Sequence, residues 1–201
     1  MPTTNSRDAH HPVEPFFLER WSPRAFDGSP LDEADLHTLF EAARWAPSAF
    51  NGQPWVFLYA RRDTPEWGQF LDLLIPFNQD WVKNASVLIY LLSDSLMQRG
   101  TGEPSPSHSH SFDAGAAWAY LALQATHLGL QAHAMVGIDF DRVRTSLAIP
   151  DRYRVEAAIA VGRPAHKSIL SEALQAREQP SDRKPIGEFA FAGRFPEGRP
   201  A

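Results

Sequence analysis

Apolar residues recur at helical spacing in several stretches of the chain. In residues 31–45 they fall at i, i+3, i+4 and i+7 counted from Leu36, which predicts a helix that Pro47 ends. Asp32 and Asp35 give this helix a start similar to a capping box. The same spacing predicts further helices at 67–74, 112–128 and 140–148.

Strands are predicted where apolar residues run together without interruption. Such runs occupy residues 55–60, 86–92, 131–136 and 155–161. The run 86–92, SVLIYLL, is continuous rather than alternating, which is typical of a strand buried on both faces. The mixed order of helices and strands therefore predicts a sheet that helices cover on both sides.

Three stretches depart from these patterns. Residues 1–14 carry no periodicity, and we expect a flexible arm there ahead of a single domain over 15–201. Residues 99–111, RGTGEPSPSHSHS, have the composition of a mobile surface loop rather than a domain linker. The tail after Pro164 is charged but includes the apolar segment 186–195, IGEFAFAGRF, which something must cover.

Composition excludes several classes of protein. With 201 residues and 43% hydrophobic side chains, the chain can bury one sizeable core. Its 19 basic and 24 acidic residues leave a net charge of −5 without a basic run, which argues against a nucleic-acid partner. The lack of cysteine excludes disulfides, thiolate metal sites and a cysteine nucleophile. Because we find neither a signal peptide nor a membrane span, we expect a cytoplasmic protein without a membrane partner.

The first candidate for chemistry is the segment RWSPRAF at 20–26. In an extended chain, Arg20, Ser22 and Arg24 share one face, and two guanidiniums with a hydroxyl suit a phosphate or an electron-rich ring edge. The alternative is a solvated surface on which the arginine stems pack against Trp21 and Phe26.

The second candidate is the polar turn PSAFNGQPW at 47–55. It offers many donors and acceptors between a predicted helix and a predicted strand. Serine, asparagine, glycine and proline are also the residues of any turn, so this segment alone does not distinguish a site from a connection.

Histidines suggest a metal site, but their pattern argues against one. His108 and His110 lie two residues apart in the serine-rich loop without a neighbouring carboxylate, and we expect them to be solvated. His127 lacks a partner in the pattern, and His133 falls in a predicted strand, where a hydrogen-bonded interior histidine is expected. Glycine patterns of a nucleophile elbow, a Walker loop or a Rossmann fold are absent from the sequence.

Taken together, the two polar segments resemble the FMN-dependent nitroreductases. That family opens with Arg-x-Ser-x-Arg/Lys-x-Phe, then a helix, then Pro-Ser-x-x-Asn-x-Gln-Pro-Trp entering a strand. Further segments resemble the family in order and spacing: FNQD at 77–80, the helix at 112–130, HAMVGIDF at 133–140 and RKPIGEF at 183–189. The resemblance runs from about Phe16 to Phe195.

The resemblance implies a role for individual residues. Arg20 and Ser22 are expected at the FMN phosphate and ribityl chain, Arg24 and Asn78 at the pyrimidine edge, and the backbone of Val136 and Gly137 at the reactive N5. The remaining residues implied to contact FMN are Pro47, Ser48, Ala49 and Asn51, mainly across a subunit interface, and Arg183 and Lys184 at the phosphate. No side chain is expected to act as an obligatory acid or base, because the flavin carries the chemistry.

The resemblance also implies a fold and an activity. The fold is α+β, with a central, mostly antiparallel sheet flanked by helices, in a domain-swapped homodimer whose C-terminal extension reaches the partner. The small residues Gly115, Ala119 and Ala122 would let two long helices approach, although packing within one subunit is the alternative.

The implied activity is a ping-pong transfer of hydride from NAD(P)H through flavin N5 to an electron-poor acceptor such as a nitroaromatic, a quinone or an activated alkene. Phe77, Trp81 and the loop 99–111 are expected at the acceptor pocket. Several relatives carry an acidic residue near Val136, so this pocket should differ. A narrower flavoenzyme acting in aldehyde reduction or flavin cleavage, a non-catalytic flavin-binding protein, and a histidine-dependent metal protein are the alternatives.

Overall fold

The structure is a computed structural model that describes residues 7–98 and 100–198. Its helices are α1 (Pro15–Glu19), α2 (Glu33–Arg44), α3 (Trp67–Asp72), α4 (Pro76–Val82), α5 (His110–His127), α6 (Phe140–Ser146) and α7 (Glu172–Gln175), with 3₁₀ turns η1 (Ala49–Asn51), η2 (Lys167–Ile169) and η3 (Ile186–Glu188). Its strands are β1 (Trp55–Arg61), β2 (Val87–Asp94), β3 (Leu96–Met97), β4 (Ser105–Pro106), β5 (Gln131–Met135) and β6 (Tyr153–Gly162).

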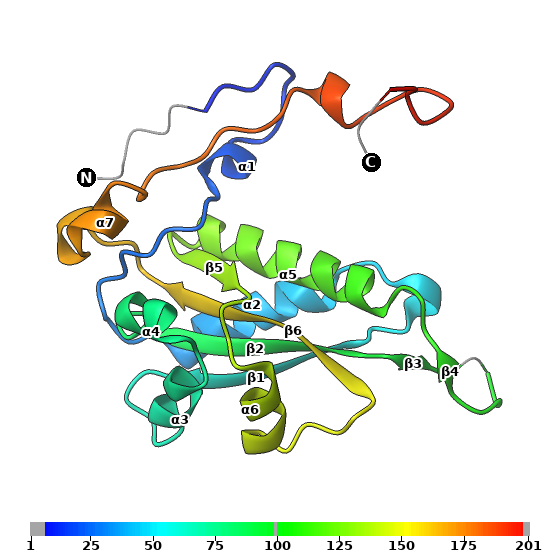
Figure 1. Ribbon diagram of the computed structural model, residues 1–201, viewed down its shortest axis with the longest axis horizontal. Coiled ribbons are helices and arrows are strands. Elements are labelled where there is room, and N and C mark those ends of the chain that lie inside the picture. The colour runs from blue at the N-terminus through cyan, green and yellow to red at the C-terminus, as the bar shows by residue number, and fades with distance from the viewer. Residues whose placement is uncertain (1–6, 99, 199–201) are drawn as a thin grey trace.

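The central sheet has the order β1-β2-β6-β5, and all three pairings are antiparallel (Figure 1). Strand β2 lies inside the sheet, and its residues from Val87 to Ser93 are all buried. The continuous apolar run in the sequence therefore predicts this strand correctly, and the α+β fold with an antiparallel sheet is confirmed.

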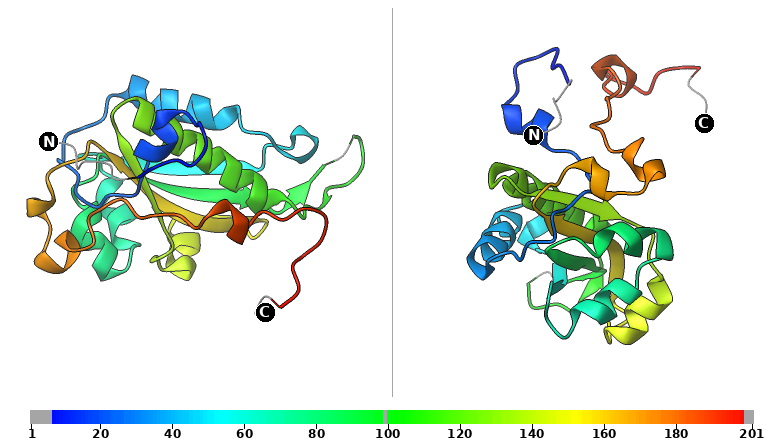
Figure 2. Two further views of the ribbon diagram at one scale, coloured as in Figure 1. Left: turned by 90° about the horizontal axis from the view of Figure 1, so that it is seen from above. Right: turned by 90° about the vertical axis from the view of Figure 1, so that its left-hand side faces the viewer.

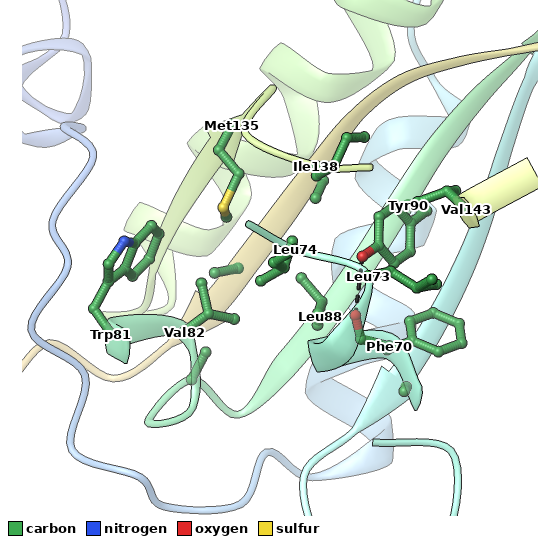
Figure 3. Packing of buried hydrophobic residues seen from close by; sticks show 14 of the residues in the cluster. Phe70, Leu73, Leu74, Trp81, Val82, Leu88, Tyr90, Met135, Ile138 and Val143 are labelled. Carbon is green, nitrogen blue, oxygen red and sulfur yellow. Dashed lines mark hydrogen bonds between the residues drawn. The ribbon is translucent and has the colours of Figure 1, made fainter. Parts of the chain in front are cut away.

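Helices cover both faces of the sheet, as Figure 1 and the right-hand view of Figure 2 show. On one face α2 and α5 pack on the side chains of Val87, Ile89 and Leu91. On the other face α3, α4 and α6 pack on the alternate residues of β2 (Figure 3). The Tyr90 hydroxyl there donates a 2.9 Å hydrogen bond to the Phe70 carbonyl, so the buried phenol is satisfied.

The loop predicted at 99–111 is shorter in the structure than the sequence pattern predicts. Strands β3 and β4 pair as a small hairpin, and α5 begins already at His110; Arg99 lies outside the described residues. The earlier helix start is explained by contacts with residues distant in the sequence: the His110 ring lies 2.7 Å from the Ser93 hydroxyl, and Ser111 donates to Glu156.

Another local prediction is wrong. Asp32 occupies the N-cap of α2, but its side chain makes no capping hydrogen bond, so the helix starts without a capping box. The apolar segment 186–195 contains the 3₁₀ turn η3 and is exposed in the single chain, so its cover by a partner subunit stays a prediction. Among the described residues, no helix is both long enough and apolar enough to cross a membrane.

Candidate functional site

The segment 20–26 is extended and lies against the chain that follows β6. The Asp27 amide donates to the Arg163 carbonyl at 3.1 Å, and the Ala165 amide donates to the Ala25 carbonyl at 2.9 Å. Pro23 and Ala25 are buried, while Ser22 and Arg24 at the alternate positions are partly exposed. The extended segment therefore presents its polar residues on one side, as the period of two predicts.

His133 holds this segment from β5. Its Nδ1 lies 2.9 Å from the Pro23 carbonyl oxygen, and since a carbonyl only accepts, Nδ1 carries the proton. The ring also lies 4.7 Å from the Trp81 ring, centre to centre. Burial, with a smaller contribution from the positive charges of Arg24 and Arg20, lowers the pKa of His133 to about 4. The prediction of a hydrogen-bonded interior histidine is confirmed.

Glu178 holds the same segment from the opposite end of the chain. One carboxylate oxygen accepts hydrogen bonds from the backbone amides of Arg24, at 2.7 Å, and Ala25, at 2.8 Å. The side chain is only 3% exposed. It follows the short helix α7, and nothing in the local sequence marks it, so sequence reasoning missed it.

Three arginines from distant parts of the chain gather beside this segment. Burial lowers the pKa of Arg20, and the positive charges of Arg183 and Arg7 lower it further. Arg7 donates to the Arg20 carbonyl at 2.7 Å and to the Ser181 carbonyl at 2.9 Å, which fastens the N-terminal arm to the C-terminal tail. Residues 1–6 of the predicted flexible arm lie outside the described residues.

Such a group of cations is suited to a multiply charged anion. Within residues 7–98 and 100–198, Arg20 forms no salt bridge, and the groups acting most on its charge are two other arginines. Guanidinium groups bind phosphate oxygens in pairs and stay charged at any ordinary pH. The predicted phosphate residues Arg20 and Arg183 are thus brought together, with Arg7 as an unpredicted third. Lys184, which follows Arg183 in the sequence, is exposed.

A chain of contacts links Arg24 to the loop after β5. The Arg24 guanidinium carbon lies 5.9 Å from the centre of the Trp81 ring, and the Trp81 indole donates to the Asn78 side-chain oxygen at 3.3 Å. The Asn78 side-chain nitrogen donates to the Gly137 carbonyl at 2.9 Å. These contacts bring Arg24, Asn78 and Gly137 into one region, as the resemblance implies.

Gly137 permits this close approach. A Cβ atom at that position would come within 2.3 Å of the Asn78 side-chain nitrogen and 2.9 Å of Ile75. A side chain at that position would displace the Asn78 amide from the Gly137 carbonyl and push the Ile75 side chain aside. The neighbouring Val136 side chain is 68% exposed, so the loop turns its side chain to the surface beside this region.

Trp81 does not line an acceptor pocket. It is 1% exposed and packs in the core against Phe26 and His133, where a large aromatic surface is best buried. Its contribution to the site is to support Arg24 and Asn78. Phe77, on the exposed side of α4, is 49% exposed, and its place at an acceptor pocket stays a prediction.

The second polar segment is a strained turn. Phe50, Asn51 and Gln53 have φ values of 53°, 56° and 45°, in a region that side chains disfavour. The Ser48 hydroxyl accepts a 3.0 Å hydrogen bond from the Gln53 amide and closes the turn. Asp113, a buried residue that sequence reasoning missed, accepts from the Ala49 amide at 3.1 Å. Strain of this kind is characteristic of functional loops.

The structure does not bring this turn to the arginine segment. Asp113 lies in the first turn of α5, whereas the arginine segment contacts β5, which follows the C-terminal end of the same helix. Helix α5 has 18 residues and is therefore about 27 Å long. In Figure 1 its N-terminal end lies beside β4, on the opposite side of the molecule from the chain that leaves α1. One chain thus carries two separate halves of the predicted site.

Comparison with known proteins places these features in a family. The model of the nitroreductase family matches residues 18–66 and 64–163. An FMN-containing oxidoreductase of known structure is 52% identical, with a TM-score of 0.93 over 98% of this chain and 99% of that one. A proposed nitroreductase of Desulfovibrio desulfuricans, solved in complex with FMN, is 28% identical, with a TM-score of 0.70 over 94% of this chain and 100% of that one.

A curated relative extends the comparison without adding a function. It is an uncharacterised 15.4 kDa protein of Mycolicibacterium smegmatis, 37% identical over 84 residues. The match covers 41% of this chain and 56% of the relative.

Proposed function

The chain belongs to the nitroreductase family, and on that basis we propose that it transfers reducing equivalents from NAD(P)H through FMN to an electron-poor small molecule. Nitroaromatics, quinones and activated alkenes are the acceptor classes we propose. The observation that carries the proposal is the gathering of Arg7, Arg20 and Arg183 beside the extended segment 20–26.

The residues present fit FMN. The cluster of arginines supplies the charge that a phosphate monoester requires. The Arg24 Nε atom is buried and lacks a hydrogen-bond partner within the described part of the chain, so a donor is left for a ligand's ring edge. Two relatives of known structure contain FMN, at 52% and 28% identity.

We assign the residues to parts of the cofactor as follows. Arg20, Ser22, Arg183 and Lys184 hold the phosphate and the ribityl chain, and Arg7 joins them. Arg24 and Asn78 lie at the pyrimidine edge, and the backbone of Val136–Gly137 faces N5. When bound, FMN would supply the redox chemistry, a ping-pong transfer of hydride from NAD(P)H to the acceptor.

The work of the chain itself is positioning and charge. Arg24 supplies a fixed positive charge where negative charge accumulates on reduction, and it keeps that charge at any ordinary pH. Asn78 fixes the carbonyl of Gly137 and with it the loop that faces N5. His133 and Glu178 hold the backbone of the arginine segment, so the donors need no reorganisation when a ligand binds.

We propose that a second copy of the chain completes each site. The turn at 47–51 packs against the first turn of α5, too far from the arginine segment of its own chain to contact the same FMN. Its residues implied to contact FMN are Pro47, Ser48, Ala49 and Asn51. Helix α5 exposes Phe112, which is 82% exposed, together with Gly115 and Ala119. Beside it, a largely apolar groove of about 510 Å³ is lined by Phe16, Phe17, Ala42, Trp45, Tyr120, Leu123, Gln124 and His127. An apolar face of this kind fits a homodimer interface.

Arg20→Ala is expected to weaken FMN binding by at least about 1.5 kcal/mol, which is roughly tenfold in Kd. The variant removes a charged donor that the neighbouring arginines cannot replace. Fluorescence titration of the FMN-free protein measures the Kd. Arg142→Ala, which removes an exposed arginine on α6, is the matched control and should bind FMN as the wild type does. An unchanged Kd in Arg20→Ala takes Arg20 out of the phosphate site.

The visible absorption spectrum tests the proposed function as a whole. The purified protein, reconstituted with FMN, is expected to show a flavin spectrum that NADPH or NADH bleaches under anaerobic conditions. Subsequent addition of a quinone or a nitroaromatic should restore the oxidised spectrum. A protein that binds FMN but is bleached by neither nucleotide is a flavin-binding protein without this activity, and one that binds no FMN overturns the proposal.

A further inference from the structure

Glu178 places a negative charge in the immediate surroundings of Arg24. One of its carboxylate oxygens lies 2.7 Å from the Arg24 amide nitrogen and 2.8 Å from that of Ala25, so two hydrogen bonds fix the carboxylate beside this backbone. At 3% exposure it is among the most buried ionisable groups in the described residues. One carboxylate oxygen accepts both hydrogen bonds, and hydrogen bonds with a charged acceptor are stronger than those between neutral groups.

The charge of Glu178 acts on Arg24 directly. Burial lowers the pKa of Arg24, the positive charge of Arg177 lowers it further, and the negative charge of Glu178 raises it. The second carboxylate oxygen of Glu178 and the Nε atom of Arg24 are both buried and make no hydrogen bond within the described part of the chain. A guanidinium nitrogen and a carboxylate oxygen, from residues whose chains meet through the Arg24 amide, are therefore left without a hydrogen-bond partner in the described part of the chain.

We propose that Glu178 sets the reduction potential of the FMN bound beside Arg24, by opposing the positive charge that Arg24 presents to the flavin ring. This rests on the proposed function, since it takes Arg24 to lie at the pyrimidine edge. Glu178 is then a positioning residue whose charge also acts on the cofactor, and it lowers the potential that Arg24 alone would give.

The direction follows from the charge of the two redox states. At neutral pH the ring of reduced FMN carries more negative charge than that of oxidised FMN. A nearby cation therefore favours the reduced state, and a nearby anion favours the oxidised one. Because Glu178 is buried, water and salt screen its charge far less than a surface charge. Its effect should persist at physiological ionic strength.

Glu178→Gln removes the negative charge of the side chain and keeps its hydrogen bonds to the backbone. The amide oxygen of glutamine can still accept from the amides of Arg24 and Ala25, whereas the negative charge is lost. We expect the variant to bind FMN and to stabilise the reduced state about tenfold relative to the oxidised one. For a two-electron couple, that shift is about +30 mV. The midpoint potential is measured by anaerobic spectroscopic titration against a reference dye.

Two further variants make the result specific. Glu172→Gln removes an exposed carboxylate on α7 and should leave the potential as in the wild type. Arg177→Glu replaces an exposed cation that also acts on Arg24, and it should lower the potential. Because Arg177 is exposed, this variant should fold, and it is measured at low ionic strength, where a surface charge is screened least; there it tests the electrostatic link if Glu178→Gln does not fold.

The outcomes distinguish this inference from the proposed function. A positive shift in Glu178→Gln, or a negative shift in Arg177→Glu, with an unchanged control, supports the assignment. A wild-type potential in folded, FMN-loaded Glu178→Gln overturns it while the proposed function stands, as does a wild-type potential in Arg177→Glu if the glutamine variant does not fold. A wild-type protein that binds no FMN overturns both.

Discussion

Removal of residues 186–201 is expected to weaken the proposed dimer at least a hundredfold, to a chain that is mostly monomeric at micromolar concentration. Ile186 and three phenylalanines of this tail are 43–72% exposed in the single chain: Phe189, Phe191 and Phe195. Burying one such side chain fully contributes roughly 1.5–3 kcal/mol, so even partial burial of four against a partner exceeds the about 2.7 kcal/mol that a hundredfold change represents.

Sedimentation velocity over a dilution series measures this change. Deletion of residues 196–201 alone keeps the apolar segment and is the matched control, expected to dimerise as the full chain does. A chain ending at Pro185 that stays dimeric at nanomolar concentration would show that the tail does not carry the interface. The proposed dimer would then rest on the exposed face of α5 and the neighbouring groove.

Acidification from pH 6.5 to about pH 4 is expected to cost the fold about 3 kcal/mol through His133 alone. Burial lowers the pKa of His133 to about 4, whereas an unfolded chain returns it to its ordinary value of 6.5. Between these values the unfolded state binds the proton and the folded state does not. The contribution of His133 to the free energy of unfolding is therefore complete above pH 6.5 and falls as the pH drops towards 4.

Urea unfolding at fixed protein concentration, repeated from pH 7.5 to pH 4, measures this loss. His133→Gln removes the imidazole at this position, so the variant's stability should fall less steeply than that of the wild type over the same range. His108→Gln changes an exposed loop histidine and should reproduce the wild-type profile. Parallel profiles of His133→Gln and the wild type would contradict the burial of a neutral imidazole.

The sheet and its helices could be predicted from the sequence because their signals are local and repeated. The run 86–92 is continuous, and in the structure it is the strand buried on both faces. The spacing of apolar residues predicts the helix at 31–45, and Pro47 marks its end before the strand that follows. The predictions were wrong at the start of α5, where contacts from residues distant in the sequence decide the structure, and at Asp32, whose side chain makes no capping hydrogen bond.

Residues of the site that belong to sequence motifs could also be predicted. The residues that hold those motifs in place through hydrogen bonds could not. Arg20 and Arg183 were expected together, and the structure brings them together. Arg7, Asp113 and Glu178 act on residues 13, 64 and 154 positions away, and no local pattern announces such partners. Trp81 was expected at a pocket because an aromatic residue beside a motif has the same sequence signature whether it is core or surface.

The arginine cluster has a thermodynamic consequence for the chain. Arg7, Arg20 and Arg183 repel one another, and this repulsion opposes the compact state until an anion neutralises it. Since Arg7 also fastens the N-terminal arm to Ser181, that repulsion acts on both ends of the polypeptide. Binding of the proposed anion and the closing of the termini are then linked equilibria, in which each favours the other. Without that anion we expect a less stable chain, whose two ends proteases cleave more readily.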